Sequence, residues 1–310
     1  MRIIFFGSDD FAVAHLKELV ERGYEVAACI AQPDKPKGRG LQVAAPATKE
    51  CALKYHIPVL QPVDLKEIHF QKKLKDLEAD LFVVVAYGKI LPREILVLPK
   101  LFCVNVHGSL LPKYRGAAPI NWAIVNGDEI TGISIIKMNE IMDGGDIIAQ
   151  KELPIDSKDT SITLRAKMVS LGSKLLCEII EKIRDNAHQC VAQNEKLVTL
   201  APKLTKEHGM IDWNKDAAAI HRLVRGLLPW PAAFTHCSGK VLKILEADCG
   251  EGSFSKADCG KIISIAKENF AVATGKGVLL VRQVHLESAK PMSTQSFLMG
   301  SRIKEGFKLG

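Results

Sequence analysis

The 310-residue sequence has 47% hydrophobic and 25% charged residues, values typical of a globular protein with ordinary cores. Its length suggests two domains, and its longest apolar run, residues 81–86, is too short to cross a bilayer. The net charge is +7, and the basic excess is denser toward the C-terminus: residues 207–310 carry 14 Lys and Arg against 10 Asp and Glu. This bias permits a polyanionic partner without requiring one.

The N-terminus lacks the length and the small-residue cleavage site of a signal peptide. The eight cysteines include no Cys-x-x-Cys spacing, so the sequence indicates neither a zinc knuckle nor a disulfide framework. We therefore expect a cytoplasmic protein without a membrane association or a metal. We also expect free thiols, mostly buried, and a monomer.

The first half of the chain alternates predicted strands and helices. Residues 2–6 form an apolar strand, and Ser8, Asp9 and Asp10 offer N-caps to an amphipathic helix over residues 11–22. Further strands are predicted over residues 25–31, 59–60, 80–86, 102–106 and 132–138, with helices over 47–55, 64–77 and 160–184. Such repeated units predict an α/β domain with a Rossmann-like, mostly parallel sheet, which binds ligands beyond the carboxyl ends of its strands.

The pattern changes toward the C-terminus. One helix is predicted over residues 217–227, followed by short strands over residues 233–237, 241–247, 260–266, 270–273 and 277–284. Short strands separated by glycine turns predict a small OB-like β-barrel domain. We therefore expect a first domain over residues 1–188, a linker over residues 189–208 and a second domain over residues 209–310.

Asn105 and His107 follow an apolar run and project from the same face of a strand, because strand side chains alternate. Asn is depleted in strands, and His is rarely unpaired in a core. Two such groups at a strand end that leads into a Gly-Ser loop indicate a site that handles protons and a developing oxyanion. The alternative is a hydrogen-bonded pair that ties down the loop.

A second motif, residues 142–146, places Gly144 and Gly145 between Asp143 and Asp146. In a parallel sheet its carboxylates could reach Asn105 and His107, where a carboxylate would orient the imidazole. The alternative is a plain turn with Asx hydrogen bonds. An amine substrate would bring its own nucleophile, so neither Ser nor Cys is needed.

Two other classes of enzyme are less compatible with the sequence. Cys103 shares the predicted face of Asn105, so a Cys/His hydrolase is a formal alternative, although Cys103 lies deeper in the apolar run. The turn after the first strand has only Gly7 of the three glycines of a dinucleotide fingerprint, and there is no phosphate-binding Gly-Lys-Ser/Thr loop. We therefore expect neither a dinucleotide cofactor nor an ATP site.

Several motifs together resemble the folate-dependent formyltransferases, most closely those that act on methionyl-tRNA. The main signature is residues 105–120, Asn-Val-His-Gly-Ser-Leu-Leu-Pro-Lys-Tyr-Arg-Gly-Ala-Ala-Pro-Ile. The matching motifs continue, in the family's order, at residues 86–92, 142–146, 159–161, 211–213, 229–231, 273–275 and 291–293. The resemblance thus covers nearly the whole chain.

The resemblance implies transfer of a formyl group from 10-formyltetrahydrofolate to the α-amino group of methionyl-initiator-tRNA, a step of translation initiation. By analogy, Asn105 and His107 stabilise the tetrahedral oxyanion, and Asp143 pairs with His107 and helps to move the proton to the folate nitrogen. The implied folate-binding residues are Ser109, Leu110, Leu111, Pro112, Tyr87, Gly88 and Ile90.

The loop over residues 33–46 resembles the family's tRNA-contacting insertion and carries Lys35, Lys37 and Arg39. The basic C-terminal domain would supply further phosphate contacts; the candidates are Arg222, Arg225, Lys240, Lys243 and Arg282. Two alternatives stay open: a formyltransferase for a small amine, such as an amino sugar or a purine precursor, and a non-catalytic RNA-binding protein. A small acceptor needs no basic barrel, and the presence of all three site residues argues against a non-catalytic protein.

Overall fold

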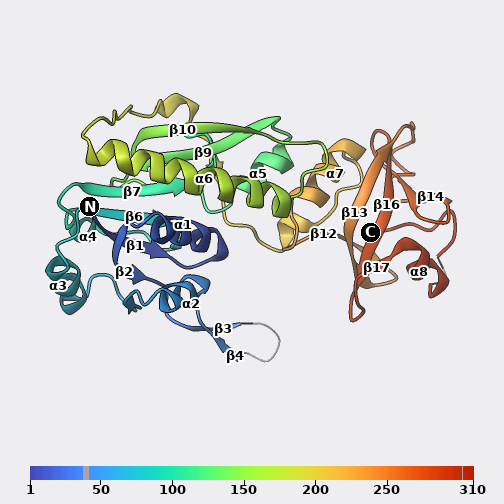
Figure 1. The fold of residues 1–310 in the computed structure, drawn as a ribbon. Coiled ribbons are helices and arrows are strands. Elements are labelled where there is room, and N and C mark those ends of the chain that lie inside the picture. The colour runs from blue at the N-terminus through green and yellow to red at the C-terminus, as the bar shows by residue number, and fades with distance from the viewer. Residues whose placement is uncertain (38–41, 302) are drawn as a thin grey trace. The chain divides into compact units, whose positions relative to one another are not determined.

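The computed structural model describes residues 1–37, 42–301 and 303–310, which form two compact units (Figure 1). The first unit comprises residues 1–119, 130–154 and 165–201. The second comprises residues 120–129, 155–164 and 202–310. Neither unit is therefore one continuous stretch of sequence.

A seven-stranded sheet forms the centre of the first unit. In spatial order its strands are β10 (Asp146–Pro154), β9 (Ile130–Lys137), β7 (Phe102–His107), β6 (Leu81–Val85), β1 (Arg2–Gly7), β2 (Glu25–Ile30) and β5 (Val59–Leu60). The strands from β5 to β7 are parallel, whereas β9 is antiparallel to β7 and β10 is antiparallel to β9. The prediction of a mostly parallel sheet is confirmed, with an antiparallel hairpin at one edge.

Helices cover both faces of this sheet (Figure 1). On one face, α3 (Ile68–Asp76) and α4 (Arg93–Leu96) bury apolar side chains in a cluster that includes Cys103 of β7. On the other face lie α1 (Asp10–Glu21) and α6 (Ser161–Arg184), which meet where Gly172 of α6 contacts His15 of α1. Because side chains alternate along β7, Asn105 and His107 share the face of Cys103.

The start of α1 follows from the sequence. The Asp9 carboxylate accepts hydrogen bonds from the N–H groups of Phe11 at 2.9 Å and Ala12 at 3.2 Å, so it caps the helix as expected. Gly23, with φ +80°, takes the left-handed conformation just after the helix ends.

The basic loop over residues 33–46 contains an antiparallel hairpin, which the sequence analysis missed. Its strands are β3 (Lys35–Lys37) and β4 (Gln42–Ala44), and α2 (Ala47–Lys54) follows. The Lys35 ammonium donates to Gln32 Oε1 at 2.6 Å. Arg39 and the side chain of Lys37 lie outside the described part of the chain.

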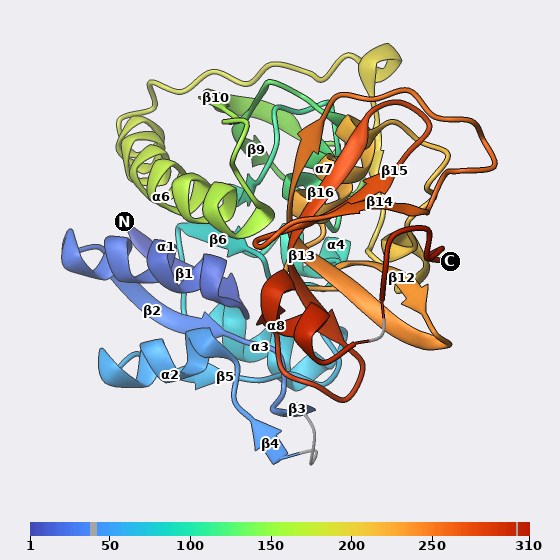
Figure 2. The ribbon, with the colours of Figure 1, turned by 90° about the vertical axis from the view of Figure 1, so that its right-hand side faces the viewer.

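The second unit is built on an antiparallel sheet (Figure 2). Its strands are β12 (Ala233–Cys237), β13 (Lys240–Gly250), β16 (Val278–Leu286), β15 (Phe270–Ala273) and β14 (Ile262–Ile265), in spatial order, with β17 (Met292–Ser293) beside β16. The chain end joins the two edges, because Ile262 N–H donates to Phe307 and Gly310 N–H to His236. The expected β-domain is therefore present as an antiparallel sheet, and its closure into an OB-like barrel stays a prediction.

Short elements complete both units. The remaining helices are α5 (Pro119–Asn126), α7 (Ala217–Gly226) and α8 (Thr294–Met299). The remaining short elements are the 3-10 turns η1 (Glu195–Leu197) and η2 (Glu207–Gly209) and the strands β8 (Arg115–Gly116) and β11 (Leu200–Ala201). β11 pairs with β8 in the first unit, so part of the expected linker packs against that unit.

All eight cysteines are free and six are buried, as expected. In the described ranges, no helix is both long and apolar enough to span a membrane.

We expect Asp9→Ala to lower the free energy of unfolding of the first unit by about 1 kcal/mol, because two helix N–H groups lose their acceptor. Hydrogen exchange of the α1 amides measures the change. The matched control is Asp9→Asn, which keeps a capping oxygen but loses the ion pair with Arg165. Equal destabilisation by the two substitutions would show that the ion pair, and not the cap, stabilises this helix end.

Candidate active site

Asn105, His107 and Asp143 meet at the end of β7. The Asn105 amide Nδ2 donates to Asp143 Oδ1 at 3.2 Å, and His107 Nδ1 lies 3.5 Å from the same oxygen. Both partners of this carboxylate are partly or fully buried, and Asp143 itself is only 13% exposed. The structure therefore brings the side chains of Asn105 and His107 to the same carboxylate oxygen of Asp143.

The route by which Asp143 reaches the site differs from the expected one. Its loop, residues 138–145, does not follow a parallel strand but joins the antiparallel strands β9 and β10. Because β9 runs against β7, its last residue, Lys137, pairs with Val104 near the start of β7. The loop then folds back along β7 until Asp143 meets Asn105.

Backbone contacts fix this loop tightly. Asp143 has φ +52°, a left-handed conformation that L-residues other than Asn and Asp rarely adopt. A Cβ atom on Gly145 would lie 1.9 Å from the Lys137 carbonyl oxygen, so only glycine fits there. The Gly116 N–H donates to Asp143 Oδ2 at 2.9 Å, which orients the carboxylate from its other side.

The hydrogen bonds of His107 determine its neutral tautomer. His107 Nε2 lies 2.9 Å from the Tyr114 carbonyl oxygen, and since a carbonyl only accepts, Nε2 carries the proton. Nδ1 is then the nitrogen that can take up a proton, and it faces the Asp143 carboxylate. The contact becomes attractive when Nδ1 is protonated, so the pair is arranged to stabilise an imidazolium.

The Asn105 amide has two N–H groups, one of which Asp143 accepts. Asp143 is the partner of this amide within the described ranges, which leaves the second N–H for a ligand. A neutral donor fixed beside a histidine suits an oxygen on which negative charge develops.

The loop after His107 is held by buried hydrogen bonds. Ser109 Oγ donates to the Lys113 carbonyl at 2.6 Å, and Ser134 Oγ donates to the Ser109 carbonyl at 2.6 Å. The Leu111 N–H donates to Ser134 Oγ at 3.0 Å. Ser109 and Leu111 are buried, whereas Leu110 packs over Gly132 and Pro112 is half-buried. The side chain of Ser109 thus shapes the loop.

The second predicted folate-binding stretch divides between core and surface. Tyr87 is buried in the α3/α4 cluster, edge-on to Phe6 at 5.5 Å, and burial raises the pKa of its hydroxyl to about 12. Gly88 and Ile90 are exposed. The buried Tyr87 side chain fixes the backbone from which these two residues project.

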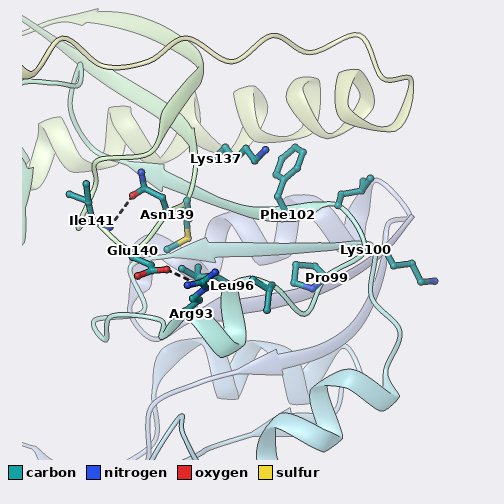
Figure 3. Close-up of a pocket in the computed structure, with 12 residues that line it drawn as sticks. Arg93, Leu96, Pro99, Lys100, Phe102, Lys137, Asn139, Glu140 and Ile141 are labelled. Atoms are coloured by element: carbon teal, nitrogen blue, oxygen red, sulfur yellow. Dashed lines mark hydrogen bonds and ion pairs between the residues drawn. The ribbon is translucent and has the colours of Figure 1, made fainter.

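A groove of about 650 Å³ lies beside the Asp143 loop (Figure 3). Its lining includes Arg93, Lys100, Phe102, Lys137 and Ile141, with the Lys137 ammonium 5.1 Å from the centre of the Phe102 ring. The lining contains none of Asn105, His107 and Asp143. The groove therefore adjoins the loop that carries Asp143 without containing the three converging side chains.

The sequence did not indicate three residues that form hydrogen bonds with one another or with the loop that carries Asp143. The Arg115 guanidinium is buried and donates to Gln193 Oε1 and to the carboxylate of Glu195. The Gln193 amide in turn donates to carbonyls of the Asp143 loop. Gln193 and Glu195 belong to the expected linker, where no periodicity or motif marks them.

Cys103 does not have the properties of a nucleophile. Its side chain is 1% exposed, its thiol donates to the Leu96 carbonyl at 3.6 Å, and burial raises its pKa to about 12. The geometry therefore gives the hydrolase alternative no support. Within the described ranges, no cluster of three or more His, Cys, Asp or Glu could hold a metal ion.

The basic residues of the second unit differ in how they are used. Arg282 pairs with Asp248, Arg225 donates to the Asp159 carbonyl, and the Arg222 side chain lies against Gly127. Lys240 is exposed and Lys243 half-exposed, and neither has a carboxylate partner among the described residues. Lys240 and Lys243 are therefore two candidates left free for an external anion; Arg222 also has no carboxylate partner among the described residues, but its Nε is buried.

Comparison with known proteins identifies the family. The Formyl transferase model matches residues 1–180, and the Formyl transferase, C-terminal domain model matches residues 203–302. The chain is 43% identical to a methionyl-tRNA formyltransferase of Acetivibrio thermocellus over 100% of both chains. It is 44% identical to that of Agathobacter rectalis over 99% of this chain and 98% of the relative. The chain belongs to the methionyl-tRNA formyltransferase family.

Solved structures share the fold at lower identity. WlaRD, a sugar 3N-formyl transferase crystallised with dTDP and 5-N-formyl-THF, has a TM-score of 0.68 at 17% identity, covering 94% of this chain and 99% of that one. HypX from Aquifex aeolicus, in complex with tetrahydrofolic acid, has a TM-score of 0.67 at 18% identity, covering 98% of this chain and 48% of HypX. These likenesses show the fold.

We expect Gly145→Ala to lower enzyme turnover at least about 100-fold, because moving the loop away from the Lys137 carbonyl also moves the Asp143 carboxylate. The comparison variant is Gly144→Ala, whose Cβ would meet side chains rather than backbone: Ile141 Cγ2 at 2.6 Å, Ile141 Cβ at 2.9 Å and Arg115 Nη1 at 3.5 Å. We expect that variant to lose at least about tenfold less turnover than Gly145→Ala, because side chains in an exposed loop yield more easily than a backbone carbonyl. Equal turnover in the two variants would show that the loop tolerates displacement.

Proposed function

We propose that this enzyme transfers the formyl group of 10-formyltetrahydrofolate to the α-amino group of methionyl-initiator-tRNA. One observation carries the mechanism: Asn105 Nδ2 and His107 Nδ1 both approach Asp143 Oδ1, at 3.2 and 3.5 Å. Full-length identity of 43% to a protein named methionyl-tRNA formyltransferase supports the choice of acceptor.

In the first step the free amine of the acceptor attacks the formyl carbon of the donor. A C–N bond forms, the C=O π electrons move to the oxygen, and the oxygen becomes an oxyanion. The second N–H of Asn105 donates to this oxyanion. His107 is neutral in this step, so its Nδ1 can still accept a proton. A fixed donor of this kind typically contributes about 10²- to 10³-fold to the rate.

In the second step the attacking nitrogen loses a proton and the folate nitrogen gains one. His107 Nδ1 accepts the proton while the Asp143 carboxylate stabilises the resulting imidazolium. As the bond between the former formyl carbon and the N10 atom of the folate breaks, the His107 imidazolium gives this proton to N10, and tetrahydrofolate leaves. The carbonyl re-forms on the acceptor, so no other reactant is required.

We place the folate donor against the exposed backbone at Gly88 and Ile90 and the loop over residues 109–112. The buried hydrogen bonds of Ser109 and Leu111 hold that loop rigid, which favours a preformed binding surface. Residues 1–188 would carry the folate site and the chemistry. Residues 209–310, joined by residues 189–208, would bind tRNA together with Lys35, Lys37 and Arg39.

A formyltransferase for a small amine is the second candidate, because the fold of the sugar enzyme WlaRD is similar over 94% of this chain. The deciding experiment is an assay of formyl transfer from 10-formyltetrahydrofolate to methionyl-tRNA, free methionine and an amino sugar. Transfer to methionyl-tRNA alone supports the proposal. Preferred transfer to the amino sugar would refute it.

We expect His107→Ala and Asp143→Asn each to lower kcat for formyl transfer by about 10²- to 10⁴-fold, because proton transfer and the charge pair are lost. Circular dichroism checks that each variant is folded. Cys103→Ser is the control in the same strand, and we expect it to keep kcat within about threefold, since its thiol is buried and protonated. A near-normal kcat in His107→Ala or Asp143→Asn would remove this mechanism.

We expect Lys240→Ser and Lys243→Ser to weaken tRNA binding and to reduce the slope of log K against log salt by about 1 each. The matched control is Arg282→Gln, which removes a cation already paired with Asp248 and should change the slope less. Filter binding of methionyl-tRNA from 50 to 300 mM salt measures the slopes. Unchanged slopes in both lysine variants would place the tRNA elsewhere.

A further inference from the structure

The peptide backbone of the Asp143 loop needs its own support. The Asp143 carboxylate is oriented by Asn105 and Gly116, but these contacts do not hold the main chain in its left-handed conformation, with φ +52°. Such a conformation persists only where surrounding contacts determine it. Part of this support lies within the loop, where the Gly144 N–H donates to the Ile141 carbonyl at 3.0 Å and Asn139 Nδ2 donates to the Gly144 carbonyl at 3.2 Å. Two further hydrogen bonds come from Gln193, about 50 positions further along the chain.

Gln193 uses its whole amide group at this place. Its Nε2 donates to the Asp143 carbonyl at 2.7 Å and to the Gly145 carbonyl at 2.7 Å, so one side chain joins both sides of Gly144. Its Oε1 accepts from Arg115 Nε at 3.0 Å and Nη2 at 2.8 Å. The amide orientation is therefore fixed, because exchanging its oxygen and nitrogen would break all four bonds.

The Arg115 guanidinium holds the Gln193 side chain in place. The Arg115 side chain is 6% exposed, and it donates to both Gln193 and Glu195, the latter at 2.8 and 3.2 Å. These hydrogen bonds lower the pKa of the Glu195 carboxyl. The next residue, Gly116, donates its N–H to Asp143 Oδ2, so the same short strand fixes the carboxylate directly and its backbone through Gln193.

We propose that Gln193, held by Arg115, is a positioning residue for formyl transfer: it fixes the loop that aims Asp143 at His107 and Asn105. The inference rests on the proposed function, since it assumes that Asp143 acts in catalysis. Gln193 itself touches none of the reacting atoms. A residue in the stretch expected to be a linker thereby sets the geometry of the catalytic carboxylate.

The test compares Gln193→Leu and Gln193→Glu with the wild type in steady-state formyl transfer. Leu removes both donors; Glu keeps the acceptor for Arg115 but turns an oxygen toward the two carbonyls. We expect both to lower kcat by about 10- to 100-fold, since a displacement near 1 Å suffices for such a loss. We expect the KM values for both substrates to stay within about threefold.

The matched control is Gln71→Leu, which removes an amide that also donates to a backbone carbonyl, that of Leu65 at 3.3 Å, but on α3. We expect this control to keep kcat within about twofold. A full kcat in Gln193→Glu would overturn the inference, because the donors to the loop would then be dispensable. A loss of kcat in Gln193→Leu matched by Gln71→Leu would also overturn it.

The double variant separates positioning from other roles. In single-turnover assays we expect Gln193→Leu to cost less than about twofold once Asp143→Asn is present, because its effect passes through the carboxylate. An undiminished loss in that background would overturn the inference alone. Full activity of Asp143→Asn by itself would remove the proposed catalytic role of Asp143. Failure of the wild type to formylate methionyl-tRNA would instead remove the proposed function, so the failures are distinguishable.

Discussion

The Asp143 carboxylate is the group on which the site depends. It joins its own loop to two strands: Oδ1 accepts from Asn105 of β7 and faces His107, and Oδ2 accepts from Gly116 of β8. A carboxylate that is 13% exposed is stable only when such partners replace its water. The close approach of Gly145 to the Lys137 carbonyl and the left-handed backbone at position 143 accompany this placement of the carboxylate.

Local patterns sufficed for most of the fold. The Asp9 cap, the apolar run of β6 and the glycine-separated strands of the second unit each depend on residues close in sequence, so their positions followed from capping and periodicity. The direction of β9 relative to β7 could not be predicted in this way, because strand polarity depends on how the chain connects rather than on alternation. The strand β10 also escaped prediction, because its side chains are mostly half-buried or exposed and give no apolar alternation.

In the candidate site, too, contacts between residues close in sequence could be predicted, whereas contacts between distant residues could not. Asn105 and His107 are two residues apart, so strand alternation alone placed them on one face. Joining Asp143 to them rested largely on the family resemblance, since the loop reaches β7 from an antiparallel hairpin. Gln193 and Arg115 are separated by 78 residues, and a single glutamine in an aperiodic segment carries no local signal of its contacts. Only the folded backbone brings their hydrogen bonds together.

Charge in the second unit illustrates why composition is a weak guide to the acceptor. The basic excess of residues 207–310 includes arginines whose guanidinium groups are already used inside the unit, such as Arg282 with Asp248 and Arg225 with the Asp159 carbonyl. Such cations have lost much of their attraction for phosphate, because their field is largely cancelled or their donors are occupied. The net charge of the unit therefore overstates its attraction for an external polyanion, and cations without a carboxylate partner, such as Lys240 and Lys243, contribute more to that attraction than the paired arginines do.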